Sequence, residues 1–266
     1  MSDASQHDVW AIGEGYERYV GRWSRLVAPK FIQWLAVPGQ RKWLDVGCGT
    51  GALTRAILQQ ASPVSIVGLE PSEGFLALAR AQTTDSRAEF RQGDGQALPA
   101  GDAEFDVVVS ALVLNFIPDQ PKALGEMQRV ARGGGTVAAY VWDYAEGMQM
   151  MRRFWDSAVA LNPAAGELDE ARRFPGCRPE PLLSMFSAAG LRNVTTTAID
   201  VPTEFKDFDD YWSPFLGGQG PAPGYCVKLP EPERVILRER IRKSLPIESN
   251  GSIELTARAW CVRGVK

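Results

Sequence analysis

Between Arg41 and Trp142, short apolar runs alternate with segments that have helical spacing, and this alternation is what most restricts the fold. It is the order that builds a parallel sheet flanked by helices. The stretch from Val107 to Leu114 is almost continuously apolar, as expected for a central strand covered on both faces. We predict strands at 42–46, 65–69, 88–91, 105–110 and 136–142, and helices near 53–60, 73–81 and 121–131. The predicted fold is a doubly wound, mostly parallel α/β sheet.

The segments outside this core differ in character. Residues 16–35 have apolar side chains at roughly helical spacing, which predicts an amphipathic helix or helix pair. A further helix is predicted at 181–189, and strands at 194–201 and 253–262. Pro202–Asn250 interleaves prolines with aromatic residues. An insertion of this length is usually functional or disordered, and its aromatic content argues against disorder.

A glycine-rich loop, Asp45–Gly51, joins the first predicted strand to the helix that follows it. Its glycines let the chain turn sharply and let a ligand approach the backbone beside the positive end of that helix. The loop also satisfies the dinucleotide fingerprint GxGxxG/A through Gly47, Gly49 and Ala52. The glycines alone therefore leave several nucleotide ligands open.

Three acidic residues near the loop reduce the number of nucleotide ligands that fit the sequence. Asp45 precedes the first glycine, where a carboxylate would repel a diphosphate and attract an ammonium or sulfonium group. Glu70 ends the next predicted strand, where an acid can accept both ribose hydroxyls, as it also does in NAD proteins. Asp94 closes the third strand and can accept the amino group of adenine. A cationic ligand that carries an adenosine explains all three acids together.

Five motifs in this region are LDVGCGTG, LEPS, GDGQALP, FDVVVS and NFIPD. Together they resemble class I S-adenosylmethionine-dependent methyltransferases, specifically the small-molecule subgroup known as type 11. The resemblance covers roughly Tyr16–Tyr140. It implies a seven-stranded sheet with an antiparallel last strand, S-adenosyl-L-methionine as cofactor, and transfer of a methyl group to a small molecule.

The resemblance also assigns cofactor contacts. The glycines would border the methionine part, with Asp45 beneath its amino group, Glu70 on the ribose and Asp94 on the adenine amine. The family lines the methionine and methyl side of the pocket with residues that follow the fourth strand, and three N-terminal aromatic residues would form a lid. The full set is Tyr16, Tyr19, Trp23, Asp45, Gly47, Gly49, Gly51, Glu70, Asp94, Gly95, Gln96, Ser110 and Asn115.

The chain departs from the family in two places. Ala131–Gly135 (ARGGG) stands where the family commonly has Leu-Lys-Pro-Gly-Gly, which loosens a turn and leaves the site intact. Asn115 stands where many members carry histidine, which places any histidine-dependent role there in doubt. With the resemblance, we predict one methyltransferase domain over 1–266. Its parts are an N-terminal helical lid (1–40), a cofactor-binding core (41–142), substrate-side helices (143–190) and the insertion (202–250).

Methyl transfer from a sulfonium releases a neutral leaving group, so the main task is alignment, which can supply about 7–11 kcal/mol. A base matters only for a protonated acceptor. Asp143 and Tyr144 follow the last parallel strand and are better placed for catalysis than the sole histidine, His7, although a loop or helix-cap role explains them as well. Apolar acceptor-pocket walls are predicted from Met148, Met151, Phe154, Trp155, Tyr211, Trp212 and Phe215, for which ordinary core packing is the alternative.

Composition excludes some partners. The formal net charge of −3 provides no basic field that would concentrate nucleic acid. The four cysteines lack the close pairs of a zinc site or disulfide framework, so we expect no metal. No run of about 18 apolar residues occurs. We expect a cytoplasmic monomer or homodimer that binds a small-molecule acceptor and neither nucleic acid nor a membrane.

Three functions other than small-molecule methyl transfer are possible for such a pocket. A protein that senses S-adenosylmethionine without transferring its methyl group would keep the same pocket. An NAD-type oxidoreductase is disfavoured by Asp45 and Asp94. A nucleic-acid methyltransferase is disfavoured because Ser110–Val113 does not have the asparagine-proline-proline-tyrosine pattern.

Overall fold

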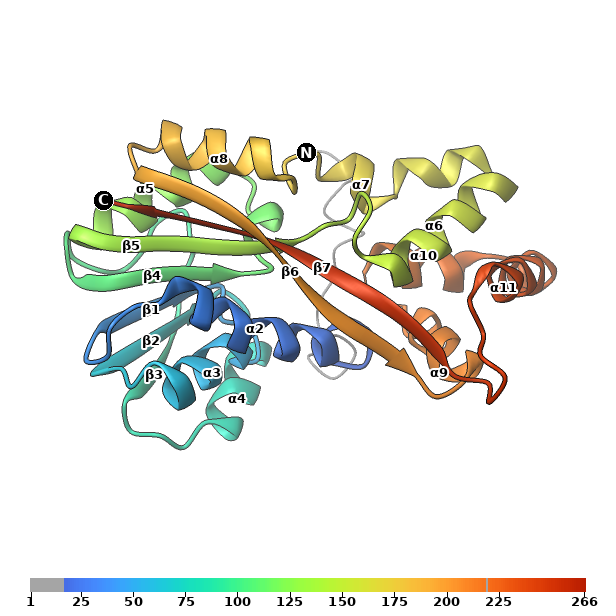
Figure 1. Cartoon of the computed structure of the whole chain (residues 1–266), viewed down its shortest axis with the longest axis horizontal. Coiled ribbons are helices and arrows are strands. Elements are labelled where there is room, and N and C mark those ends of the chain that lie inside the picture. Colours follow the sequence, from blue (N-terminus) through green and yellow to red (C-terminus); the bar gives the residue numbers. More distant parts are fainter. Residues whose placement is uncertain (1–16, 219) are drawn as a thin grey trace. The chain divides into compact units, whose positions relative to one another are not determined.

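The computed structural model describes residues 17–218 and 220–266, and the chain divides into two compact units (Figure 1). The unit that we call the sheet unit comprises Ser24–Trp142, Gly176–Ile199 and Ala259–Lys266. The helical unit comprises Met1–Trp23, Asp143–Pro175 and Asp200–Arg258. The predicted cofactor-binding core, 41–142, lies wholly in the sheet unit, whereas the predicted substrate-side segment, 143–190, is divided between the units.

A seven-stranded sheet has the order β3-β2-β1-β4-β5-β7-β6. The pairs β1–β2, β1–β4, β2–β3 and β4–β5 are parallel, and β7 runs antiparallel to β5. The order reverses between β1 and β4. The strands are β1 (Lys42–Val46), β2 (Ser65–Glu70), β3 (Ala88–Gln92), β4 (Phe105–Ala111), β5 (Ala131–Trp142), β6 (Arg192–Phe205) and β7 (Ile253–Val265). This confirms the predicted fold class.

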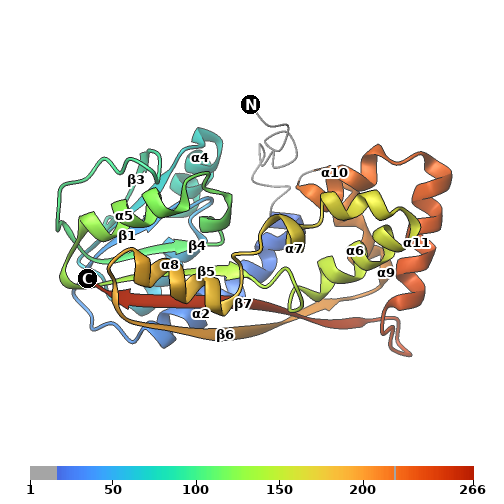
Figure 2. The same ribbon diagram turned by 90° about the horizontal axis from the view of Figure 1, so that it is seen from above.

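Helices cover the sheet: α4 (Glu73–Gln82) packs on β2 and β3, and α5 (Gln120–Val130) on β4 and β5 (Figure 2). Three more helical segments near this sheet are α2 (Arg22–Leu35), α3 (Ala52–Gln60) and α8 (Pro179–Ala188). A short 3-10 turn, η3 (Leu114–Phe116), follows β4. The predicted helices of the core are confirmed to within two residues at each end.

The helical unit contains most of the predicted insertion. Its α6 (Gln149–Leu161) packs on α10 (Pro221–Lys228), α11 (Glu231–Ser244) and η4 (Pro163–Glu167). The other elements are η2 (Glu17–Gly21, a π-helix), α7 (Glu170–Arg173), α9 (Phe208–Trp212) and η5 (Ser213–Leu216). The insertion therefore forms helices rather than an extended loop.

Three predicted strand boundaries were wrong. β5 begins at Ala131 instead of 136, because Ala131 pairs with Phe105 before a register shift in the parallel ladder. β7 extends to Val265, which pairs with Thr136 of the lengthened β5. β6 continues through Pro202 to Phe205. Proline is tolerated there because β6 is the last strand in the order and has an unpaired edge.

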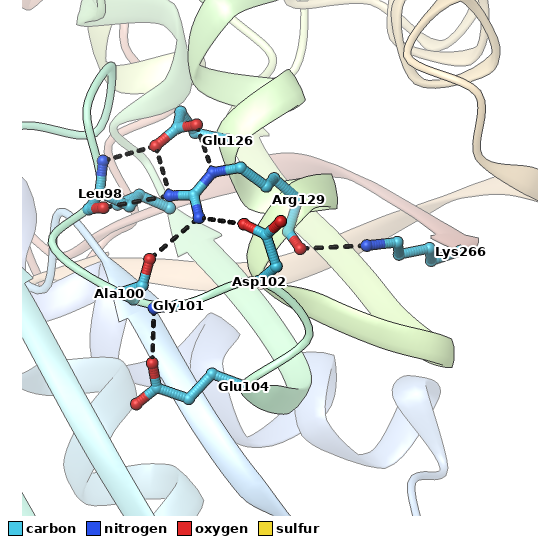
Figure 3. A network of polar contacts seen from close by, with 8 residues as sticks. All are labelled: Leu98, Ala100, Gly101, Asp102, Glu104, Glu126, Arg129 and Lys266. Carbon is cyan, nitrogen blue, oxygen red and sulfur yellow. Dashed lines mark hydrogen bonds and ion pairs between the residues drawn. The ribbon is translucent and has the colours of Figure 1, made fainter.

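An arginine on α5 fixes the loop between β3 and β4 (Figure 3). The Arg129 guanidinium donates to Glu126 at 2.7 and 2.8 Å, to Asp102 at 2.7 Å, and to the carbonyl oxygens of Leu98 and Ala100. Glu126 in turn accepts from the Leu98 N–H at 2.8 Å. One side chain thus satisfies two loop carbonyls and two carboxylates.

We expect Arg129→Met to lower the melting temperature by about 2–6 °C, since it removes charged hydrogen bonds worth about 1–2 kcal/mol after solvent screening. Arg91→Met is the matched control, because Arg91 forms its ion pair with Glu89 and both side chains are exposed. Its melting temperature should be nearly unchanged. Equal shifts in the two variants, measured by differential scanning calorimetry, would contradict a special role for Arg129.

Candidate functional site

The glycine loop closes against the ends of two strands. The N–H groups of Gly47 and Cys48 donate to the carbonyl of Leu69 at 2.7 and 3.0 Å, so the loop folds back over β2. Gly47 has φ +73°, and a Cβ placed on it would lie 2.5 Å from Cγ1 of Val113. Gly51, with φ +82°, is the N-cap of α3. The loop therefore needs glycine both for its conformation and for its contact with the segment after β4.

The Glu70 side chain connects the end of β2 to the glycine loop by hydrogen bonds. Its Oε2 accepts from the Gly49 N–H and its Oε1 from the Ser72 N–H, both at 3.1 Å. The residue is 6% exposed, and burial raises the pKa of its carboxyl group although the two backbone N–H groups oppose that shift. The carboxylate that was predicted to bind a ribose thus lies directly beside the glycine loop.

Asp45 lies fully buried at the end of β1. Its Oδ2 accepts from the Thr54 hydroxyl at 2.7 Å, whereas its Oδ1 is buried and has no hydrogen-bond partner in the part of the chain that the structure describes. Burial raises the pKa of Asp45 to about 7, with a smaller contribution from Glu70, while the Thr54 hydrogen bond opposes the rise. An unsatisfied buried acceptor that resists ionisation is suited to a positively charged ligand group.

The loop after β3 is tight and lies against the same region. Asp94 Oδ1 accepts from the Gln96 N–H at 2.8 Å, and Gln96 Oε1 accepts from the Asp119 N–H at 3.1 Å. A Cβ on Gly95 would lie 3.2 Å from side-chain atoms of Val46 and Ile117. Asp94 itself is exposed. The loop thus lies beside the end of β1 and carries an exposed carboxylate, whose oxygens accept from Gln96.

The end of β4 and the turn that follows it contain two buried polar side chains that lack hydrogen-bond partners within 17–218 and 220–266. Ser110, in β4, is fully buried, and its Oγ has no partner among these described residues. Asn115, on η3, is 7% exposed, and neither its Nδ2 nor its Oδ1 has a partner among them. The sheet unit therefore brings the glycine loop, Glu70, the Asp94 loop and this segment together at the carboxyl ends of its parallel strands, where open α/β sheets bind ligands.

Comparison with known proteins agrees with this geometry. A family model described as a methyltransferase domain matches residues 44–139. A demethylmenaquinone methyltransferase of Bacillus licheniformis is 32% identical over 179 residues, which make up 62% of this chain and 76% of that protein. The chain belongs to the class I S-adenosylmethionine-dependent methyltransferases. It is a methyltransferase, and its cofactor is S-adenosylmethionine.

Solved structures with the same fold support this assignment of the architecture. The YcgJ protein of Bacillus subtilis has a TM-score of 0.58 at 17% identity, covering 92% of this methyltransferase and 98% of that chain. A phosphoethanolamine N-methyltransferase of Haemonchus contortus in complex with S-adenosyl-L-methionine has a TM-score of 0.56 at 14% identity. That match covers 91% of this methyltransferase and 52% of the other chain.

Two of the three predicted lid residues, Tyr19 and Trp23, belong to the helical unit. Tyr16 lies outside the described residues. Tyr19 is buried with its ring edge-on to Phe215, at a centroid distance of 5.6 Å. Trp23 is buried against Phe205 in the same way at 5.4 Å. Both have aromatic partners within their own unit, and their role as a lid stays a prediction.

The two candidate catalytic residues are also buried in the helical unit. Asp143 accepts from the Glu146 N–H at 3.2 Å, which caps the turn after β5. Tyr144 packs on Phe174 with a centroid distance of 5.7 Å. These contacts give both residues a local structural function, and a catalytic one stays a prediction.

The predicted acceptor-pocket residues form one buried aromatic and methionine cluster in the helical unit. Phe154 stacks on Phe215 at 4.5 Å, and the Tyr211 hydroxyl donates to the Met150 carbonyl at 2.8 Å. The predicted members, all buried, are Met148, Met151, Phe154, Trp155, Tyr211, Trp212 and Phe215. Their contact with an acceptor stays a prediction.

Glu170 is a buried acid that sequence reasoning missed. Its carboxylate accepts from the Trp155 indole N–H, and burial raises its pKa to about 7. It lies in a run of charged residues, Glu167–Arg173, that has the appearance of a solvated surface. No local pattern distinguishes Glu170 from the other charged residues of this run, so only tertiary structure identifies it.

No helix within 17–218 and 220–266 is both long and apolar enough to span a bilayer. The same residues contain no group of three histidine, cysteine, aspartate or glutamate side chains that could hold a metal ion.

Proposed function

We propose that this methyltransferase acts on a small, largely apolar acceptor with an oxygen, nitrogen or carbon nucleophile, and that the acceptor is a ring of the quinone class. The proposed class of acceptor is supported by the 32% identity with a demethylmenaquinone methyltransferase. A quinone ring is electron-poor, whereas the cofactor's methyl group requires an electron-rich partner. The reactive form is therefore the reduced ring with its two hydroxyl groups.

We propose the following cofactor contacts. S-adenosylmethionine supplies an electrophilic methyl group on a positively charged sulfur. Asp45 holds the ammonium group with its unpartnered Oδ1, which is supported by its burial and raised pKa. Glu70 accepts from the ribose hydroxyls, and Asp94 accepts from the adenine amine. The other proposed contacts are Tyr16, Tyr19, Trp23, Gly47, Gly49, Gly51, Gly95, Gln96, Ser110 and Asn115.

Methyl transfer requires that the methyl group and the acceptor be aligned more than it requires proton transfer. The methyl carbon forms a bond to the acceptor as its bond to sulfur breaks, and the sulfur leaves as a neutral thioether. The polar groups at Asp45 and Asn115 are buried, so water is largely excluded from them. Alignment of the two reactants is then the main source of rate enhancement. The acceptor releases one proton after the transfer.

Transfer from methyl-labelled S-adenosylmethionine to anaerobically reduced 1,4-naphthoquinone tests this proposal, with phenols, amines and 1,3-diketones as a wider panel. We expect label in the reduced quinone. The Glu70→Ala variant is the control and should transfer far more slowly. Labelling of amines alone would overturn the quinone class, and labelling of nothing would overturn the small-molecule acceptor.

Cofactor binding is expected to weaken as pH falls below about 7, because Asp45 must lose its proton before it can pair with the ammonium group. Its raised pKa, about 7 in the free protein, moves this loss of charge into the neutral range. Each pH unit below the pKa then lowers affinity by up to about tenfold, and the full affinity is present above it.

Calorimetric titration with S-adenosylhomocysteine at several pH values between about 5.5 and 7.5 checks this dependence. Asp45→Asn should bind more weakly and with a flatter profile. Glu70, whose pKa burial also raises, is unchanged in that variant, so the difference between the two profiles belongs to Asp45. Parallel profiles would show that Asp45 does not bind the ammonium group.

A further inference from the structure

Four exposed apolar side chains lie in neighbouring elements of the helical unit. Leu216 of η5, Val227 of α10, and Val235 and Ile236 of α11 are between 40% and 55% exposed. The first three line one hollow of about 490 Å³. Exposed apolar residues that are scattered singly are common, whereas a group of them beside a hollow is typical of a surface that binds a partner.

Helix α11 carries opposite charges at its two ends. Glu231 and Glu233 stand in its first turn, Arg242 and Lys243 stand in its last turn, and all four side chains are exposed. The two exposed apolar residues of the helix lie between these ends. The exposed surface of α11 therefore changes along the helix from acidic through apolar to basic.

This order of charges is complementary to itself when a second α11 lies antiparallel to the first. The acidic end of each helix then faces the basic end of the other, and the apolar residues meet in the middle. A two-fold interface forms every such contact twice, and an apolar centre with a polar rim is typical of protein interfaces. An anionic partner such as a phospholipid surface would instead place like charges against Glu231 and Glu233.

The packing of α11 leaves room for such a partner. Its buried residues are Leu237 and Ile241, and the helix packs on α6 (Figure 1). Ile236, by contrast, is 55% exposed and is the most exposed large apolar side chain in the described part of the chain. The hollow beside Val235 is large enough for an isoleucine side chain. Each copy thus offers one protruding side chain and a place that can receive one.

We propose that two copies of the chain form a homodimer through antiparallel packing of their α11 helices, with Ile236 of each copy in the hollow beside Val235 of the other. Ion pairs between the acidic end of one helix and the basic end of the other close the interface on both sides. The interface lies within the helical unit and includes no proposed cofactor contact. The homodimer does not depend on which acceptor the enzyme methylates.

Sedimentation equilibrium of the full chain between about 1 and 100 µM tests the homodimer. The unmodified protein should reach twice the monomer mass and should dissociate as salt is added, because salt screens the ion pairs. Two double variants, Glu231→Lys with Glu233→Lys and Arg242→Glu with Lys243→Glu, should each raise the dissociation constant at least about tenfold, since each places like charges opposite one another. An equimolar mixture of the two should dimerise again, because the reversed ends match.

Single substitutions at two exposed apolar positions complete the test. Ile236→Glu should be monomeric, whereas Val64→Glu should keep the mass of the unmodified protein, because Val64 is 47% exposed in the sheet unit. Melting curves establish that each variant is folded. An unmodified protein that stays monomeric up to about 100 µM would overturn the inference, and so would a monomeric mixture of folded charge variants or a dimeric Ile236→Glu variant. A monomer that co-sediments with phosphatidylglycerol vesicles would show that a lipid surface is the partner instead.

Discussion

Gly47→Ala is expected to lower the affinity for S-adenosylhomocysteine by at least about 100-fold. The residue has φ +73°, which costs a non-glycine residue about 1–2 kcal/mol. The added Cβ would also lie 2.5 Å from Cγ1 and 2.9 Å from Cβ of Val113, so the loop or the segment after β4 must move. Either movement separates the glycine loop from the groups that are proposed to bind the methionine part.

The Gly134→Ala variant distinguishes the two possible causes of the lost affinity, which are backbone strain and the contact with Val113. Gly134 has a similar φ of +77°, but a Cβ there would meet nothing within 4 Å. It should therefore lose stability by the same backbone cost and keep its affinity for S-adenosylhomocysteine within about twofold. Isothermal titration and a melting curve for each variant are sufficient. Equal loss of affinity in both would show that backbone strain, rather than contact with Val113, governs the site.

The sheet unit was largely predictable because its signals are local. Each core strand is a short apolar run, and the loop at Gly47 and the acid at Glu70 stand at strand ends where the order of elements already places them. The glycines alone did not select a cofactor. The acids narrowed the choice of ligand, and their contacts with the cofactor stay predictions. The structure places Glu70 against Gly49 at 3.1 Å and buries Asp45 beside the same loop.

Two kinds of structural feature could not be predicted from the sequence. The start of β5 at Ala131 depends on pairing with Phe105, while the glycines that follow suggest a turn. Burial without a partner, as at Asn115, and burial within a charged run, as at Glu170, depend on atoms far away in the chain. The pattern of residue types in a sequence does not show which distant atoms will surround a given side chain.

The second large effect concerns Glu70. Glu70→Ala is expected to raise the dissociation constant of S-adenosylhomocysteine by about 10- to 100-fold, because charged hydrogen bonds to a ligand are worth about 1.5–3 kcal/mol. The same substitution also frees the N–H groups of Gly49 and Ser72, which the carboxylate now holds at 3.1 Å. Glu73→Gln, on the exposed side of α4, is the matched control and should bind normally.

Nucleoside fragments distinguish a ribose contact from a general loosening of the loop. The unmodified protein should prefer adenosine to 2′,3′-dideoxyadenosine, because the carboxylate of Glu70 accepts from both hydroxyl groups. In Glu70→Ala that preference should disappear, whereas a loosened loop would weaken both nucleosides equally and preserve it. An unchanged dissociation constant in a folded Glu70→Ala variant would show that the ribose lies elsewhere.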